Sequence, residues 1–177
     1  LGLVEKITRA ELAVLLLEEF KLAELVRQRR PLRQQNPFRA PGQEQVEPPE
    51  PDDINFSWAQ PWIEEILDLG VPGLELAGTS FRPDEPITRA NYARVNEGIL
   101  TLITADNKLS TRYIGESSPF PDVRSDSYAF NAIALNVDRV IMSADKITGQ
   151  FHPNSTVSGA EALLIVRELQ NAVRMEF

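Results

Sequence analysis

Cysteine is absent from the 177 residues, and histidine occurs once, at position 152. The missing cysteines exclude disulfides, thiolate metal ligands and cysteine nucleophiles. A single histidine without cysteine does not make a typical zinc site. No apolar run approaches the about 20 residues that a membrane-spanning helix needs. We therefore expect no metal, no cofactor and no membrane span.

Motifs that carry common enzyme chemistry are also missing. No serine lies in a nucleophile elbow, and the glycine-containing stretch at 70–78 lacks P-loop spacing. The stretch "DDIN" at 52–55 is too short to predict a calcium loop. We find no catalytic constellation and predict that the protein is not an enzyme.

Positive charge is scarce. The chain has 18 Lys and Arg against 26 Asp and Glu, a formal net charge of −8. A field of this sign repels nucleic acid, and no dense basic face is evident. The sequence begins at Leu1 without the charged and apolar segments of a signal peptide. We expect either a cytoplasmic chain or a processed or truncated piece of an exported protein.

The most informative feature that is present is an internal repeat. Residues 51–71, "PDDINFSWAQPWIEEILDLGV", align without a gap with residues 121–141, "PDVRSDSYAFNAIALNVDRVI", an offset of 70 residues. The same offset places residues 80–95 over residues 150–165. A match of this length without gaps indicates duplicated structural units.

The opening stretch is a third, incomplete copy. Residues 7–17, "ITRAELAVLLL", align with residues 87–97 and 157–167. We predict the second half of one repeat at 1–28, a linker rich in Pro, Gln and charge at 29–50, a second repeat at 51–104, a polar connection at 105–119 and a third repeat at 120–177.

Each whole repeat is predicted to fold as helix, loop and helix. Ser57 with Gln60 is a candidate capping box for the first helix, and Gly70 is a plausible end. Such short repeats cannot bury their apolar faces alone, so they should pack on one another in an all-α fold. The expected helices lie near 57–70, 88–104, 125–141 and 158–175.

Arg9 poses a question. Thr8 and Glu11 form a predicted capping box, which puts Arg9 at the first helical position. A cation there is mildly unfavourable, because this is the positive end of the helix dipole. A bound anion would explain the arginine, since a helix N-terminus and a guanidinium both attract carboxylates. Arg89 occupies the equivalent position in the second copy, whereas the third copy has Gly159.

Taken together, these motifs resemble the S-layer homology (SLH) domain family. The family pattern is an acidic residue, a first helix with Trp or Tyr, a glycine loop, an F-x-P step and a T-R-A-E box. The matching elements are "TRAE" at 8–11; Asp52, Trp58, Gly70, "FRP" at 81–83 and "TRAN" at 88–91; and Asp122, Tyr128, "FHP" at 151–153 and "SGAE" at 158–161.

The resemblance implies a pseudo-threefold helical bundle that anchors exported proteins to the cell envelope. Such domains bind cell-wall polysaccharide, often carrying pyruvate ketals, or peptidoglycan, in grooves between repeats. The arginine of the box meets the acidic group of the glycan. Carried over to this chain, the expected ligand-binding residues are Arg9, Arg89, Thr8, Thr88, Asp52, Trp58, Asp122 and Tyr128.

Simpler roles stand beside these. The threonines are N-caps first of all, and the arginines fit surface ion pairs. Trp58 and Tyr128 also fit core positions, and the aspartates fit local turns. Gly159, Asn91 in place of Glu, and the long linker allow a degenerate scaffold. In this second hypothesis the repeats dock other envelope proteins or copies of the same chain.

Overall fold

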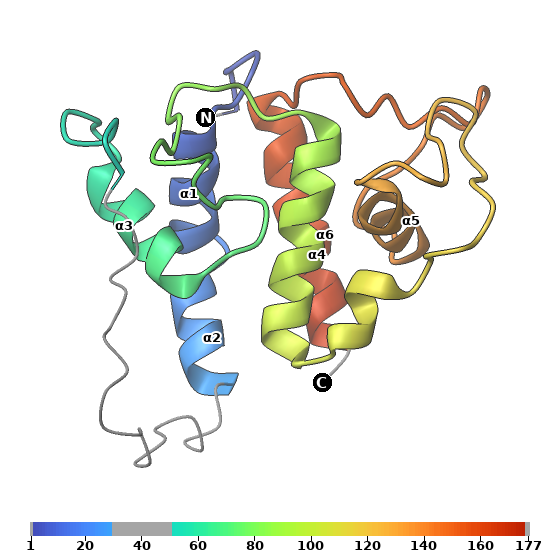
Figure 1. Ribbon diagram of the computed structural model, residues 1–177, viewed down its shortest axis with the longest axis horizontal. Coiled ribbons are helices and arrows are strands. Elements are labelled where there is room, and N and C mark those ends of the chain that lie inside the picture. The colour runs from blue at the N-terminus through green and yellow to red at the C-terminus, as the bar shows by residue number, and fades with distance from the viewer. Residues whose placement is uncertain (1, 30–50, 176–177) are drawn as a thin grey trace.

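The computed structural model describes residues 2–29 and 51–175, and this part of the chain is helical (Figure 1). It contains isolated β-bridges but no strand or sheet within the described ranges. The all-α prediction is confirmed. The helices are α1 (Arg9–Glu18), α2 (Leu22–Arg29), α3 (Gln60–Leu69), α4 (Arg89–Thr104), the 3-10 helix η2 (Asn107–Thr111), α5 (Phe130–Asp138) and α6 (Gly159–Met175).

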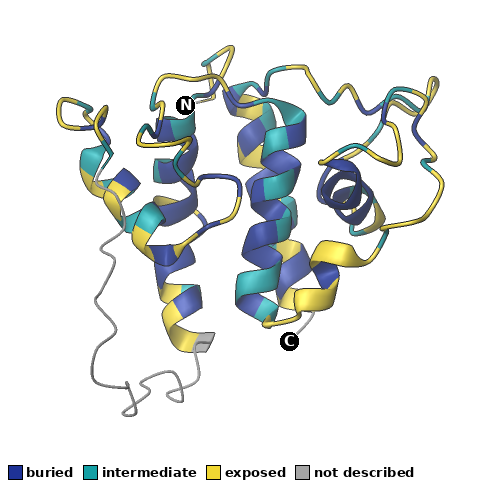
Figure 2. Cartoon of the chain, in the orientation of Figure 1, coloured by how far each residue is buried: buried dark blue, intermediate teal, exposed yellow. Residues whose placement is uncertain are grey.

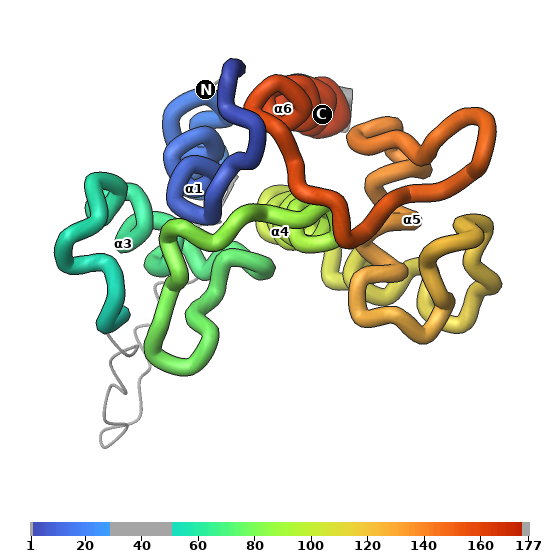
Figure 3. Tube along the Cα trace, turned by 90° about the horizontal axis from the view of Figure 1, so that it is seen from above, coloured from blue at the N-terminus to red at the C-terminus, as the bar shows by residue number. Residues whose placement is uncertain are grey.

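Helices α1, α4 and α6 run side by side in the same direction, with their N-termini at one end of the molecule. Figure 3 shows these three nearly end-on, with α3 beside α1 and α5 beside α4. Helix α5 is buried over most of its length, from Phe130 to Asn136 (Figure 2). The three long helices therefore form the centre of the molecule, and α3 and α5 flank it.

A cycle of three backbone hydrogen bonds joins the segments that lead into these helices. The amide of Ile7 donates to the Val157 carbonyl at 2.9 Å, Ile87 to Ile7 at 2.9 Å, and Val157 to Ile87 at 3.0 Å. All three residues are fully buried. They occupy the same position in each copy of the repeated box, so the cycle holds the three helix N-termini in register. The predicted pseudo-threefold bundle of whole repeats stays a prediction, which this cycle supports.

The predicted helix starts at Thr8, Thr88 and Ser158 are confirmed. Thr8 and Glu11 form a complete capping box. The hydroxyl of Thr88 accepts from the third amide of α4 at 3.2 Å, and that of Ser158 accepts from the third amide of α6 at 3.2 Å. Helix α3 ends as predicted at Gly70, whose φ of 65° lies in the left-handed region that glycine adopts at low cost.

The predicted capping box at Ser57 and Gln60 is wrong. Helix α3 begins only at Gln60, and Ala59 at its N-cap offers no side-chain hydrogen bond. The Ser57 hydroxyl instead accepts from the Ala59 amide at 3.3 Å, so this serine closes a turn ahead of the helix. Helix α5 is likewise preceded by a turn and is shorter than the predicted 125–141.

The two predicted connections differ in what the structure describes. The polar segment at 105–119 contains the short helix η2, capped by the Asp106 carboxylate, which accepts from the Lys108 amide at 3.0 Å. The predicted linker at 29–50 lies outside the described residues, apart from Arg29 at the end of α2.

Candidate functional site

Arg9 lies in a cradle of backbone carbonyls from the loop between α3 and α4. Its Nε donates to the Phe81 carbonyl at 2.7 Å, and its two terminal nitrogens donate to Gly73 at 3.3 Å and Glu75 at 2.9 Å. Its guanidinium carbon lies 4.7 Å from the centre of the Phe81 ring. A guanidinium has five N–H groups, so three engaged bonds leave two for another acceptor.

Arg89 occupies the equivalent cradle in the next repeat. Its Nε donates to the Phe151 carbonyl at 2.8 Å, a terminal nitrogen donates to the Ser143 carbonyl at 2.7 Å, and the guanidinium carbon lies 4.6 Å from the Phe151 ring. The remaining terminal nitrogen forms an ion pair with the Glu161 carboxylate on α6. Both cradles therefore have a phenylalanine carbonyl, the ring of that residue and one further carbonyl, and they differ in the last partner, the Glu75 carbonyl for Arg9 and the Glu161 carboxylate for Arg89.

The first-turn amides of α1 and α4 are already engaged. The first two amides of α1 donate to the carbonyls of Glu85 and Pro83, both at 3.0 Å, and the third donates to the Thr8 hydroxyl at 3.2 Å. In α4 the acceptors are Ser155, Pro153 and Thr88. The expectation that these helix N-termini themselves attract a carboxylate is therefore wrong, because their first three amides are engaged, and only the arginine side chains can bind an anion there.

Burial changes the pKa of Arg9 but leaves the side chain charged. Desolvation lowers the pKa of the Arg9 guanidinium below its usual value, although the nearby carboxylates of Glu85 and Glu75 oppose this shift. The guanidinium pKa is so high that the group stays charged. A partly desolvated cation attracts a carboxylate more strongly than a fully hydrated one.

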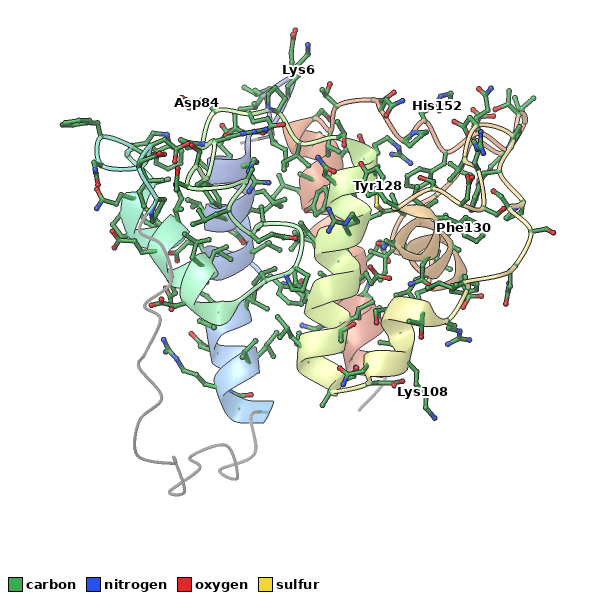
Figure 4. All side chains as sticks on the ribbon, in the orientation of Figure 1. Lys6, Asp84, Lys108, Tyr128, Phe130 and His152 are labelled. Atoms are coloured by element: carbon green, nitrogen blue, oxygen red, sulfur yellow. The ribbon has the colours of Figure 1, made fainter. Side chains whose placement is uncertain are left out.

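Trp58 and Tyr128 are exposed, so the alternative that they fill core positions is wrong. Trp58 is 62% exposed and Tyr128 is 73% exposed. The Tyr128 hydroxyl donates to the Asn91 side-chain oxygen at 3.4 Å, and the Arg94 guanidinium lies 5.6 Å from its ring. Figure 4 shows Tyr128 between α4 and α5, beside the first turns of α4. Both rings are placed where a flat apolar ligand surface can reach them.

Asp122 binds a loop that is distant in the sequence, rather than the local turn that its simpler interpretation predicts. Its carboxylate accepts from the consecutive amides of Phe151 and His152 at 2.9 and 2.7 Å. Burial raises the pKa of the Asp122 carboxyl, but these two amide bonds outweigh it, and the pKa is lowered. His152 has a φ of 57°, in the left-handed region.

Asp53, rather than Asp52, has this role in the preceding repeat. The Asp53 carboxylate accepts from the amides of Phe81 at 2.8 Å and Arg82 at 2.6 Å. Asp52 accepts instead from the hydroxyls of Thr79 at 2.6 Å and Ser80 at 2.9 Å, and these two bonds lower the pKa of its carboxyl. The ungapped pairing of Asp52 with Asp122 is thus wrong by one residue.

A pocket of about 990 Å³ lies beside α3, between that helix and the loop that follows it. Its lining includes the carboxylate-bearing Glu64, Asp68 and Glu75. None of the eight predicted ligand-binding residues lines it. This pocket therefore belongs to a single repeat and is distinct from the predicted grooves.

The described residues contain no cluster of three or more His, Cys, Asp or Glu side chains able to hold a metal ion. Within the same residues, every helix is too short or too polar to span a bilayer.

Residues 119–163 match the family model of the S-layer homology domain. This segment contains Asp122, Tyr128, the F-x-P step and the third box, and it is an S-layer homology domain. Domains of this family are non-catalytic and generally anchor proteins to cell-wall polymers, which implies association with the cell envelope or surface. No curated protein matches the chain.

Proposed function

We propose that this chain is an anchoring module that binds an acidic cell-wall polysaccharide or peptidoglycan glycan in grooves between its repeats. The observation that carries the proposal is the exposed ring of Tyr128 beside the first turns of α4, with the Arg94 guanidinium 5.6 Å from the centre of that ring. A cation and an exposed aromatic ring on one surface suit a sugar that carries an acidic group. The module works outside the cytoplasm, on the envelope.

The arginine and the aromatic side chains would bind different parts of the glycan. A guanidinium holds a carboxylate, such as that of a pyruvate ketal, through parallel charge-assisted hydrogen bonds. An exposed tryptophan or tyrosine presents an apolar face with a polar edge, on which a sugar ring stacks. Arg9 and Arg89 would hold the anion, and Trp58 and Tyr128 would stack on the sugars.

The remaining predicted residues support the site. Thr8 and Thr88 fix the helix starts from which the arginines project. Asp122 holds the loop whose Phe151 carbonyl receives Arg89. Asp52 binds the hydroxyls of Thr79 and Ser80, directly ahead of the Phe81 carbonyl that receives Arg9. Their contribution to binding is to position these loops, with the outer edge of the Asp52 carboxylate also open to sugar hydroxyls.

Sedimentation with purified cell-wall sacculi tests the proposal. We expect the wild type to sediment and the double variant Trp58→Ala/Tyr128→Ala to lose most of its binding. Phe56→Ala is the matched control, because Phe56 is a fully exposed aromatic residue outside the site. An Arg9→Ala/Arg89→Ala variant tests the anion contact and requires a check of unchanged helicity. If the wild type stays in solution, or the aromatic variant sediments equally well, the proposal is wrong.

One observation favours the second candidate, a scaffold for protein assembly. On α6, Leu163 is 38% exposed and Leu164 is 61% exposed. The residues equivalent to Leu163 are Ala13 on α1 and Ala93 on α4, and both are fully buried. This face of α6 is open where the other two helices are covered. Sedimentation equilibrium of wild type against Leu164→Ser tests whether another copy of the chain binds there.

A further inference from the structure

The equivalent helices α3 and α5 are covered to different extents. Every residue of α5 from Phe130 to Asn136 is buried, whereas the buried residues of α3 are Ile63, Ile66 and Leu69. Figure 2 shows this difference as a mostly dark blue α5 and an α3 with exposed stretches. A segment that covers α5 therefore has no counterpart over α3 among the described residues.

The segment that covers α5 is the connection that leads into its repeat. Helix η2 of this connection contacts both α4 and α5. Leu109 of η2 is 3% exposed, and its carbonyl accepts from the Asn131 side chain of α5 at 2.8 Å. The side-chain oxygen of Asn131 accepts from the Tyr113 amide at 2.8 Å. The connection thus packs on the first helix of the repeat that it precedes.

The pocket of about 990 Å³ lies beside α3. Its apolar lining includes the buried Ile54 and the partly buried Leu67 and Leu76. Two exposed carboxylates, Glu64 and Asp68, also line it. Neither forms an ion pair within 4.0 Å with another described residue. The pocket therefore combines an apolar surface with negative charge that lacks a direct cationic partner in the described part of the chain.

The connection that leads into the second repeat fits this surface in position and in charge. Residues 30–50 follow α2 and end beside Pro51, which itself lines the pocket. The part 30–40, "RPLRQQNPFRA", has three arginines, no acidic residue and the apolar Leu32 and Phe38. The intervening residues 41–50 span up to about 35 Å when fully extended, so they allow residues 30–40 to reach the pocket.

We propose that the pocket beside α3 is the docking site of residues 30–40 of the same chain. Phe38 binds the apolar surface at Leu67 and Leu76, and the arginines pair with Glu64 and Asp68. A tethered ligand needs little intrinsic affinity, because the short connection keeps its effective concentration high. The predicted glycan-binding residues lie outside this pocket, so docking is a separate property from envelope anchoring.

Paramagnetic broadening in the ¹⁵N–¹H spectrum of the full chain tests the docking. The chain has no cysteine, so Gln35→Cys attaches a single nitroxide spin label within the proposed ligand. We expect the amide signals of Leu67 and Leu76 to broaden, because both residues line the pocket. The amide signal of Leu163, on α6, should stay sharp.

Removing the charge of the pocket should release the segment. We expect Glu64→Gln/Asp68→Asn, made in the spin-labelled chain, to lose most of the broadening. The matched control is Asp84→Asn/Glu116→Gln, which removes two exposed carboxylates outside the pocket and should keep the broadening. High salt should weaken the broadening in the wild-type pocket, because exposed charges are screened.

Three results would overturn the proposal. Sharp signals of Leu67 and Leu76 would mean that residues 30–40 do not dock, and equal broadening in the two double variants would mean that Glu64 and Asp68 do not hold them. Broadening in a mixture of spin-labelled ¹⁴N protein with unlabelled ¹⁵N protein would assign the pocket to another copy of the chain. Sedimentation with sacculi is measured on the same variants, and a loss there without a change in broadening concerns the proposed function alone.

Discussion

At the scale of the residue, the pKa values of two carboxyl groups are shifted in opposite directions by their surroundings. Asp122 accepts two backbone amides, and its pKa is lowered. Glu97 is partly buried between α4 and α5, and its carboxylate accepts a hydrogen bond from the Asn131 side chain. Desolvation raises the pKa of Glu97, and this effect outweighs the lowering by the Asn131 hydrogen bond and by the charge of Arg94. The two groups should therefore give the stability of the protein opposite dependences on pH.

Asp122→Asn should lower the midpoint of thermal unfolding at neutral pH, because an amide cannot accept from both amides of the loop. A carboxyl with a lowered folded pKa stabilises the protein above its unfolded value of about 3.9, and this contribution is lost as the pH falls through the folded pKa. The variant should show a smaller loss of stability on acidification. Circular dichroism melts between pH 2 and pH 7 measure it, with exposed Asp84→Asn as the control. Equal slopes for the wild type and Asp122→Asn would contradict the assignment.

Glu97→Gln should raise the unfolding midpoint at pH 7. A carboxyl with a raised folded pKa loses stability as the pH rises from its unfolded value, about 4.3, through the folded value. Glutamine keeps the oxygen that accepts from Asn131 and removes the desolvated charge. The advantage of the variant should vanish below about pH 4 in the same melts. A lower midpoint at neutral pH would show that the charge of Glu97 is used in the folded state.

Sequence patterns predicted the local contacts of single residues and missed the distant ones. The caps at Thr8 and Thr88 bind amides three residues away, and such spacing is visible in the sequence. The amides bound by Asp53 lie in a loop 28 and 29 residues further along the chain. Three residues separate Asp53 from Ser57, but four separate Asp122 from Ser127, so no ungapped alignment matches both pairs. The signal available in the sequence was that Asp52 and Asp53 are adjacent, so that either could be the counterpart of Asp122.

At the scale of the element, the loop after α3 lies directly against α4. Gly73 has a φ of 91°, and a Cβ there would lie 2.8 Å from the Val95 side chain and 3.0 Å from its backbone nitrogen. A Cβ on Gly98 of α4 would lie 2.7 Å from the Pro72 ring. The two glycines let loop and helix approach closely, and the carbonyl of Gly73 then reaches Arg9.

Gly73→Ala should therefore lower the free energy of unfolding by about 2 kcal/mol or more, from backbone strain and overpacking together. Gly78→Ala is the control, since Gly78 has a φ of 72° but open space where the Cβ would be. That variant should cost about 1 kcal/mol through strain alone. Urea denaturation of both variants measures the difference. Equal losses would mean that the loop moves away from α4 without cost.

The starts of α1 and α4 and the end of α3 were predicted correctly from the sequence, whereas the starts of α3 and α5 were not. Threonine caps and Gly70 are local signals, and they placed α1, α4 and the end of α3 correctly. Ahead of α3 and α5 the chain makes a turn that Ser57 and Ser127 close, so both helices begin later than their apolar pattern suggests. The exposed Trp58 belongs to that turn, which is why it does not lie in the core position that it also fits by sequence.

At the scale of the whole molecule, the segment that matches the family is tied to the rest of the chain. Residues 119–163 include Val157, whose amide donates to Ile87, and α5 lies against α4. Asn136 of α5 accepts from Asn96 at 2.8 Å and donates to the Ala93 carbonyl at 2.9 Å, both on α4. These hydrogen bonds between buried side chains and backbone link α5 to α4.

A fragment of residues 119–177 should therefore lack a cooperative unfolding transition, although it contains the whole matched segment. Separated from α4, it exposes the buried face of α5 and leaves Asn136 without its partners on that helix. Differential scanning calorimetry of the fragment beside the full chain measures this. A sharp transition in the fragment would show that one repeat is an independent folding unit.

The repeat was predicted from the sequence because the aligned segments keep their apolar and capping residues in register. The order in which the three boxes contact one another was not, because it depends on backbone groups that every residue type carries. Nor was the pair of Arg89 with Glu161, whose members are 72 residues apart in different boxes. Sequence similarity between copies shows which residues are equivalent, and contacts between copies have to come from the structure.

The cycle of hydrogen bonds through Ile7, Ile87 and Val157 limits how further copies of the box can be added to such a protein. Each of the three residues has given its amide to one neighbour and received the amide of the other. An open stack of repeats always has a free end to which a further copy adds, but a closed cycle has none. A fourth box cannot join a closed cycle of three, so further boxes gained by gene duplication have to form a second cycle. We therefore expect the number of boxes in longer proteins of this kind to increase by threes.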